Sequence, residues 1–248
     1  MTVHLTILTG ASRGLGLAMA RQRLAEGHRL LTISRRPAEL PAADAAALQQ
    51  WSADLADPGA VAARLEDWLA AMDVATLASA TLINNAGVVS QLAPLGTVAS
   101  ADLSQALRVG LEAPMLLTAA FLRATARWPL PRKVLLISSG LGRRAMAGSA
   151  SYCAAKAGLD HLARVVALEE SGLPHGARIV SLAPGVIDTD MQVQLRSADP
   201  ALFPERERFV GLQTAGQLDS PAQAAAKVLR TLDRADFGAN PVADVRDG

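Results

Sequence analysis

The chain has 248 residues, half of them hydrophobic, and its formal net charge is only +1. This length suits one α/β sheet domain, which we expect over residues 1–248. The near-neutral balance, with no basic run longer than the pairs at 35–36 and 143–144, disfavours nucleic acid and acidic membrane surfaces as partners. No apolar run approaches the roughly 20 residues of a membrane helix. The single cysteine, Cys153, and an N-terminus without a basic leader or cleavage site favour the cytoplasm.

Strand-like and helix-like segments alternate along the chain. Residues 3–9 form a short run of β-forming residues that ends at Gly10, and a helical pattern follows over 14–27. Further strands are predicted at residues 29–34, 51–54, 81–84, 133–138, 177–183 and 242–245, and helices at 40–50, 59–72, 101–128, 151–171 and 221–235. Because parallel strands need crossover helices, this order predicts a doubly wound parallel α/β sheet of the Rossmann type, with helices on both faces.

Residues 190–220 break the alternation, since they are polar, contain proline and stand between a strand and a helix. Irregular segments of this kind often cover active sites, so we expect a substrate lid here. Phe203, Phe209 and Leu212 either line an apolar substrate pocket beneath the lid or only anchor the segment.

A glycine-rich turn lies between the first strand and the first helix. Glycines at such a position allow a tight turn, a close approach to a pyrophosphate and free amides at a helix N-terminus. The alternative is a turn that simply ends a strand, but its place between strand and helix favours nucleotide binding, and the lysine of an ATP-binding loop is absent. The candidate residues are Gly10, Ser12, Arg13, Gly14, Leu15 and Gly16.

The end of the second strand favours NADP(H) over NAD(H). At this position a carboxylate binds free ribose hydroxyls, whereas arginine binds a 2′-phosphate. The sequence has Ser34, Arg35 and Arg36 here, and Arg13 can face the same ribose. The arginines could instead be solvated surface charges. Asp54 and Leu55, after the third strand, are candidates for the adenine contact, with helix capping by the aspartate as the alternative.

Tyr152 is the only tyrosine, and Lys156 follows it by four residues on a predicted helix. This spacing places both side chains on one helix face. A nearby ammonium favours the ionised phenol, so we expect Lys156 to bring the pKa of Tyr152 down from its usual value of about 10 and make it a general acid. The alternative is a surface tyrosine beside a solvated lysine.

Several motifs together resemble the short-chain dehydrogenase/reductase family over residues 9–191. They are the glycine-rich turn, Asn-Asn-Ala-Gly at 84–87, Ile-Ser-Ser at 137–139, the Tyr152–Lys156 pair and residues 184–191. Within the family, residues 113–118, 152–153 and 184–191 look like the benzil and sepiapterin reductase group, which reduces ketones and vicinal dicarbonyls with NADPH.

The resemblance implies roles for individual residues. Ser139, thirteen residues before Tyr152, would orient the substrate carbonyl while Tyr152 donates a proton and Lys156 also holds the nicotinamide ribose. Asn85, Ala86 and Gly87 would line the adenosine side, although read without the family they are a turn. The segment that would fix the carboxamide, or otherwise only end a strand, comprises Pro184, Gly185, Val186, Ile187 and Thr189.

Gly110 departs from the family pattern, because many relatives carry a proton-relay asparagine at that position. We expect water against exposed backbone near Gly110 to take its place.

The sequence thus predicts an NADPH-dependent carbonyl reductase acting on a small-molecule carbonyl substrate. The alternatives are a non-catalytic dinucleotide-binding sensor or assembly protein and an NAD-dependent alcohol dehydrogenase. The four scattered histidines predict no metal site, and Cys153 is expected to pack rather than react. Apolar residues around the helices at 101–128 and 151–171 suggest a homodimer or higher homo-oligomer.

Overall fold

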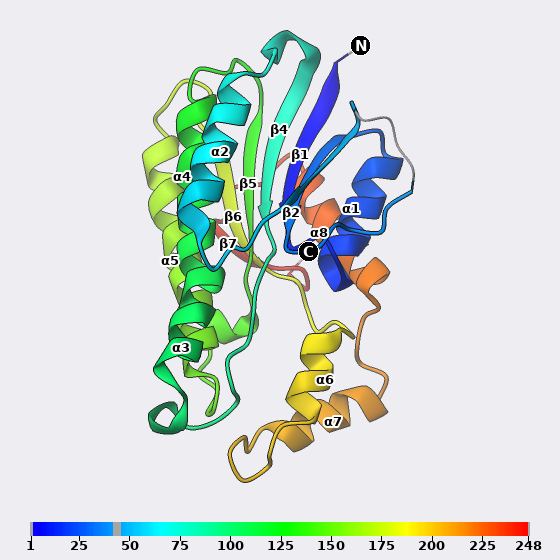
Figure 1. Ribbon diagram of the computed structural model, residues 1–248. Coiled ribbons are helices and arrows are strands. Elements are labelled where there is room, and N and C mark those ends of the chain that lie inside the picture. Colours follow the sequence, from blue (N-terminus) through cyan, green and yellow to red (C-terminus); the bar gives the residue numbers. More distant parts are fainter. Residues whose placement is uncertain (1, 42–45, 248) are drawn as a thin grey trace.

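The computed structural model describes residues 2–41 and 46–247, and its described part contains one seven-stranded parallel sheet in the order β3-β2-β1-β4-β5-β6-β7. The predicted doubly wound parallel sheet is therefore confirmed (Figure 1). The strands are β1 (Val3–Thr9), β2 (Arg29–Ser34), β3 (Leu48–Ser52), β4 (Leu77–Asn84), β5 (Arg132–Ile137), β6 (Arg178–Ala183) and β7 (Val242–Asp244).

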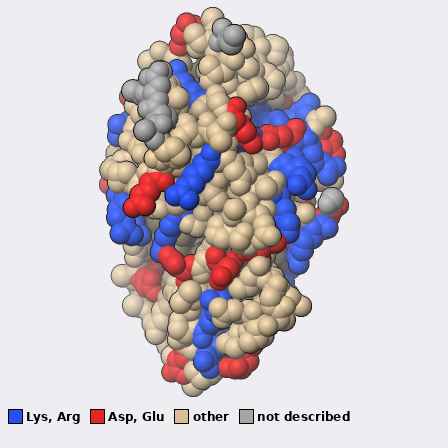
Figure 2. Space-filling view, turned by 90° about the vertical axis from the view of Figure 1, so that its right-hand side faces the viewer, with Lys and Arg blue, Asp and Glu red and all other residues tan. Residues whose placement is uncertain are grey.

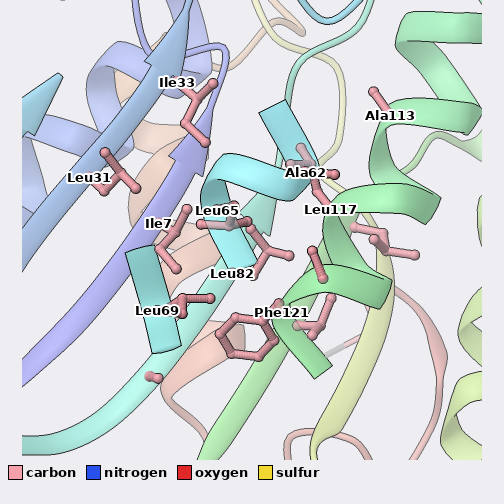
Figure 3. Close-up of a cluster of buried hydrophobic side chains, with 14 of the residues drawn as sticks. Ile7, Leu31, Ile33, Ala62, Leu65, Leu69, Leu82, Ala113, Leu117 and Phe121 are labelled. Carbon is pink, nitrogen blue, oxygen red and sulfur yellow. The ribbon is translucent and has the colours of Figure 1, made fainter. Parts of the chain in front are cut away.

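Helices cover both faces of this sheet. Helices α1 (Gly14–Ala25) and α8 (Pro221–Asp233) pack on one face, and α2 (Pro58–Ala70), α4 (Ala113–Thr125) and α5 (Ala150–Glu170) on the other (Figure 1). Successive strand residues point to opposite faces, so Ile7 joins the core under α2 and α4, whereas Leu8 joins the core under α1 and α8. Figure 3 shows Ile7 and Leu82 of the sheet facing Phe121 of α4.

The helix predicted at residues 40–50 is wrong where the structure describes it, while 42–45 lie outside the described residues. Strand β3 already begins at Leu48, three residues before the predicted start, and pairs with β2. The Gln50 side chain accepts a hydrogen bond from the Ala38 amide at 2.7 Å and donates to the Ala38 carbonyl at 3.3 Å. These tertiary contacts hold an edge strand in a segment whose local pattern favours a helix.

The single helix predicted at residues 101–128 is divided. Helix α3 (Ser100–Leu107) is followed by a π-helical segment, η3 (Arg108–Glu112), and then by α4. Pro114 accounts for the break, because proline has no amide hydrogen to donate to the carbonyl four residues earlier and its ring clashes with that carbonyl.

Residues 190–220 contain two helices rather than only irregular chain, α6 (Asp190–Arg196) and α7 (Arg206–Thr214), and both lie beyond the end of the sheet (Figure 1). The two ends of this segment lie side by side. Ile187 and Asp219 form a parallel bridge there, and the Asp219 amide donates a hydrogen bond to the Val186 carbonyl at 2.9 Å. We call residues 190–214 the lid segment. Three short 3₁₀ turns complete the elements: η1 (Val74–Thr76), η2 (Leu95–Thr97) and η4 (Gly140–Gly142).

None of the helices in the described ranges is long and apolar enough to cross a bilayer. Acidic and basic side chains both occur across the face of the molecule shown in Figure 2, so no field of one sign covers it.

Candidate active site

One cavity of about 1110 Å³ lies along the edge where the parallel strands end, which is where ligands bind in open α/β sheets. It extends from the glycine-rich turn to the lid segment. Every residue predicted for the site lines this cavity: Gly10, Ser12, Arg13, Gly14, Leu15, Gly16, Ser34, Arg35, Arg36, Asp54, Leu55, Asn85, Ala86, Gly87, Ser139, Tyr152, Lys156, Pro184, Gly185, Val186, Ile187 and Thr189. The fold therefore gathers segments that are far apart in the sequence, while their individual roles stay predictions.

The glycine-rich turn is built around backbone approaches that side chains would block. A Cβ on Gly16 would lie 2.1 Å from the Gly10 carbonyl oxygen, and one on Gly10 would lie 2.8 Å from Ala86 Cα. Gly10 also has a φ of +69°, in the left-handed region that glycine tolerates. Asn85 fixes the turn from the neighbouring strand end, because its amide nitrogen donates to the carbonyls of Thr9 and Gly10 at 3.0 and 3.1 Å. The resulting cradle beside the N-terminus of α1 fits a pyrophosphate.

The basic residues predicted at the adenosine end are differently engaged. Arg35 and Arg36 are exposed, whereas the buried Ser34 hydroxyl donates to the Arg36 carbonyl at 2.9 Å and so holds the turn after β2. Arg13 forms an ion pair with Asp190 at the start of α6, with both side chains more than half exposed. Exposed ion pairs contribute little stability, so Arg13 can exchange this partner for another anion.

Asp54 is predicted to contact the adenosine, with helix capping as the alternative. Its carboxylate accepts the Ala56 amide at 2.9 Å in a turn, and the residue that precedes the first turn of α2 is Asp57. Asp54 is therefore not the cap of that helix.

Ser139, Tyr152 and Lys156 approach the cavity from two elements. Ser139 is the second residue after β5, and its hydroxyl accepts a hydrogen bond from the Leu141 amide at 3.2 Å. Tyr152 lies in the first turn of α5 and Lys156 one turn later, both facing the end of β5. The Lys156 Nζ donates to the Ile137 carbonyl at 2.7 Å and lies 5.4 Å from the centroid of the Tyr152 ring.

The predicted lowering of the Tyr152 pKa is wrong in this structure. Burial raises the pKa of Tyr152 to about 12, and the neighbouring Ser139 hydroxyl opposes this only in part. Burial also lowers the pKa of Lys156 to about 8, against the opposing effect of Asp160. Lys156 gives its hydrogen bond to a backbone carbonyl rather than to the phenol, which explains why it does not bring Tyr152 toward neutral pH.

The exposed backbone expected at Gly110 is wrong, while the water path near it stays a prediction. Gly110 is buried within η3, and a Cβ at this position would lie 3.1 Å from the Ala155 Cβ on α5. Glycine here permits η3 and α5 to approach closely.

The lid segment contributes apolar residues to the cavity. Phe209 and Leu212 line it, whereas Phe203 is fully buried and stacks on Phe209 with ring centroids 5.9 Å apart. Phe209 and Leu212 therefore line the pocket, whereas Phe203 anchors the segment. Together with Leu92, Met146 and Leu195, the two phenylalanines form a third buried cluster, which we call the lid core. Cys153 packs against it, as expected.

Sequence reasoning missed Asp160 and Arg143. Asp160 lies four residues after Lys156 and is buried. Arg143 lines the cavity and forms an ion pair with Asp160. The i, i+4 spacing from Lys156 was the available signal, because it extends the face that carries Tyr152. In the described ranges no group of three or more His, Cys, Asp or Glu side chains is arranged to hold a metal ion.

Comparison with known proteins places this geometry in context. The family model described as short chain dehydrogenase matches residues 4–200. A benzil reductase ((S)-benzoin forming) from Bacillus cereus is 34% identical over 235 residues, covering 93% of this chain and 94% of that protein. A sepiapterin reductase from Xenopus tropicalis is 31% identical over 245 residues, covering 92% of this chain and 91% of that protein. A short-chain dehydrogenase/reductase structure from Burkholderia vietnamiensis is 35% identical, covers 99% of both chains and superposes with a TM-score of 0.66.

Proposed function

The chain belongs to the short-chain dehydrogenase family, and we propose that it is an NADPH-dependent carbonyl reductase that acts on a small ketone or vicinal dicarbonyl. The observation that carries this proposal is the single cavity shared by Ser139, Tyr152, Lys156 and the glycine-rich turn. A hydroxyl, a phenol and an ammonium beside a nucleotide cradle suit proton donation to a carbonyl oxygen next to a hydride donor.

Tyr152 is proposed as the general acid. Its raised pKa of about 12 keeps the phenol protonated at neutral pH, the form that a proton donor requires. Ser139 holds the carbonyl oxygen by hydrogen bonding. Lys156, with a pKa of about 8, is mainly cationic at pH 7, so its charge stabilises the phenolate that Tyr152 becomes after giving up its proton.

The residues present fit a nicotinamide dinucleotide, which supplies the hydride when bound. The cradle at Gly10 and Gly16 leaves no room for side chains and presents backbone to a pyrophosphate. Arg13, Arg35 and Arg36 supply the positive charge that a 2′-phosphate needs, which favours NADPH over NADH. The segment from Pro184 to Thr189, which lines the same cavity, would hold the carboxamide.

The far end of the cavity favours an apolar carbonyl compound. Its walls include Leu141, Met146, Leu195, Phe209 and Leu212, with Ser139 and Tyr152 at the reacting end. Apolar walls with a few convergent polar groups are typical of sites for small organic ligands. The benzil reductase relative points in the same direction, because its substrate is an aromatic vicinal diketone.

The test is oxidation of NADPH and of NADH, followed by absorbance, with a panel of aromatic and aliphatic ketones and diketones. We expect turnover with NADPH and an aromatic diketone, and a loss of roughly 10²-fold or more in Tyr152→Phe. Cys153→Ser is the matched control, since Cys153 is adjacent in sequence but packs against the lid core.

The two alternatives give different results in the same assay. Tight NADPH binding without turnover of any carbonyl would identify a non-catalytic dinucleotide-binding protein. Faster alcohol oxidation with NAD than carbonyl reduction with NADPH would identify an alcohol dehydrogenase. Either result contradicts the proposal.

A further inference from the structure

Helix α5 presents a third functional side chain beyond Tyr152 and Lys156. Asp160 follows Lys156 by four residues, as Lys156 follows Tyr152, so the three lie along one helix face. Asp160 is only 1% exposed. A buried carboxylate is costly unless it is paired and hydrogen-bonded, so its partners indicate what it holds in place.

Three donors from three elements converge on Asp160. Its Oδ1 accepts hydrogen bonds from the Ser138 hydroxyl at the end of β5 and from the Ser181 hydroxyl of β6, both at 2.7 Å. Its Oδ2 accepts from Nε of Arg143 at 3.0 Å. Arg143 in turn donates through Nη2 to the Ala243 carbonyl of β7 at 2.9 Å. Asp160 therefore ties β5, β6 and β7 to the helix that carries Tyr152.

These contacts fix the chain on both sides of Ser139. Ser138, directly before it, is held by Asp160, and Arg143 holds the turn η4 that follows it. The turn packs so closely on α5 that a Cβ on Gly142 would lie 3.0 Å from the Asp160 Oδ2. The position of Ser139 relative to Tyr152 thus depends on the Asp160 carboxylate.

Asp160 also brings a negative charge close to Lys156. The charged and titratable groups recorded near Lys156 are Tyr152 and Asp160 on α5, and Arg143 on the loop after β5 pairs with Asp160. The other close neighbours are the Ile137 carbonyl and the backbone at Gly87, where a Cβ would lie 3.8 Å from Nζ, and neither titrates. Burial lowers the pKa of Lys156 to about 8, and the charge of Asp160 acts against that fall.

We propose that Asp160 is a positioning residue of the reaction, which holds Ser139 opposite Tyr152 through Ser138 and Arg143 and provides the negative charge one helical turn from Lys156. The proposal rests on the proposed carbonyl reductase function. Two variants separate its parts, because they change the charge near Lys156 in opposite directions. Asp160→Asn removes the carboxylate but keeps nearly the same shape, whereas Arg143→Met keeps the carboxyl group and removes the cation beside it.

The first measurement is the pKa of Lys156 by NMR of protein carrying ¹³C-labelled lysine, with Lys133 and Lys227 as the only other lysine signals. We expect Asp160→Asn to lower the Lys156 pKa by about one unit or more and Arg143→Met to raise it. Arg144→Met is the matched control, because it removes an exposed charge one residue away and should leave the Lys156 pKa unchanged. Arg143 is 32% exposed, so its variant remains informative if Asp160→Asn does not fold.

The second measurement is steady-state kinetics with NADPH and a diketone. We expect both variants to lower kcat at least tenfold, because Ser139 loses its alignment. In Asp160→Asn we also expect KM and the NADPH Kd to stay within about threefold of wild type, because Asp160 does not line the cavity. A Lys156 pKa that stays unchanged or moves in the same direction in both variants overturns the proposal, and so does a kcat near wild type in a variant that is only less stable. The NMR result needs no turnover, so inactivity of the wild-type enzyme counts against the proposed function alone.

Discussion

The lid core provides a quantitative test of how independently the lid segment is stabilised. Phe203 and Phe121 are both fully buried phenylalanines, but Phe203 lies in the lid core and Phe121 in the core between α4 and the sheet. Replacing a buried phenylalanine with alanine costs about 3–5 kcal/mol. In Phe203→Ala that loss falls on the lid core, which includes the stack with Phe209 and joins the lid segment to Leu92 and Met146. Since 1.4 kcal/mol is tenfold in an equilibrium constant, local opening of the lid should become roughly a hundredfold to a few thousandfold more frequent.

Hydrogen exchange followed by mass spectrometry measures this opening. We expect Phe203→Ala to accelerate amide exchange in α6 and α7 while β1 and β4 exchange at close to wild-type rates. Phe121→Ala is the matched control, and it should accelerate exchange throughout the sheet and lower the Tm by about 6–20 °C, from roughly 2–4 °C per kcal/mol at this chain length. Equal acceleration of lid and strands in Phe203→Ala would refute the reasoning, because the lid would then unfold only together with the sheet.

Three further predictions follow from single contacts. Gly110→Ala should cost about 1–3 kcal/mol in unfolding free energy, because its Cβ would lie 3.1 Å from that of Ala155, and Ala155→Gly should restore stability in the double variant measured by urea denaturation. His28 has its pKa lowered from 6.5 to about 4, first by burial and then by the charge of Arg23. Between pH 6.5 and about 4 the His28 imidazole is protonated in the unfolded chain but not in the folded one, so the free energy of unfolding should fall as the pH drops through this range. His28→Gln should reduce that fall, which denaturation at pH 7 and pH 4.5 would measure. Arg35→Ala should weaken NADPH binding roughly ten- to a hundredfold by fluorescence titration and leave NADH binding almost unchanged; an equal loss for both cofactors would contradict 2′-phosphate recognition.

Local chemistry was sufficient to predict most of the fold and the position of the site. Five of the seven predicted strands overlap observed ones almost completely, and the strand predicted at 81–84 is the second half of β4, because buried parallel strands are short apolar runs that end at turns. The candidate residues gather at one cavity for a topological reason, since parallel strands place all the loops that follow them at the same edge. A glycine after β1 and a serine after β5 must then lie near each other whatever the details of packing.

What the sequence did not reveal depends on contacts between distant residues. The strand at Leu48–Ser52 is held by β2 and by Gln50, which bonds to Ala38, so no local periodicity predicts it. The π-helical segment before Pro114 combines a local cause, the proline, with a tertiary one, the approach of α5 at Gly110. The alanine-rich sequence just before Leu48 favours a helix there, because alanine favours helices without specifying a face.

The pKa values of Tyr152 and Lys156 show most clearly why spacing alone was insufficient. Four-residue spacing places an ammonium near a phenol, but the pKa of each group also depends on burial and on the partner each nitrogen or oxygen finds. Lys156 finds the Ile137 carbonyl, and Asp160 supplies the charge that partly offsets its burial. The phenol stays protonated as a result, so in the proposed reaction Tyr152 keeps its proton until the carbonyl oxygen gains negative charge. Full protonation alone does not make an effective general acid, because such an acid works best with a pKa near the working pH. With the pKa of Tyr152 raised to about 12, the proposed reduction therefore depends on the charge of Lys156 to stabilise the phenolate.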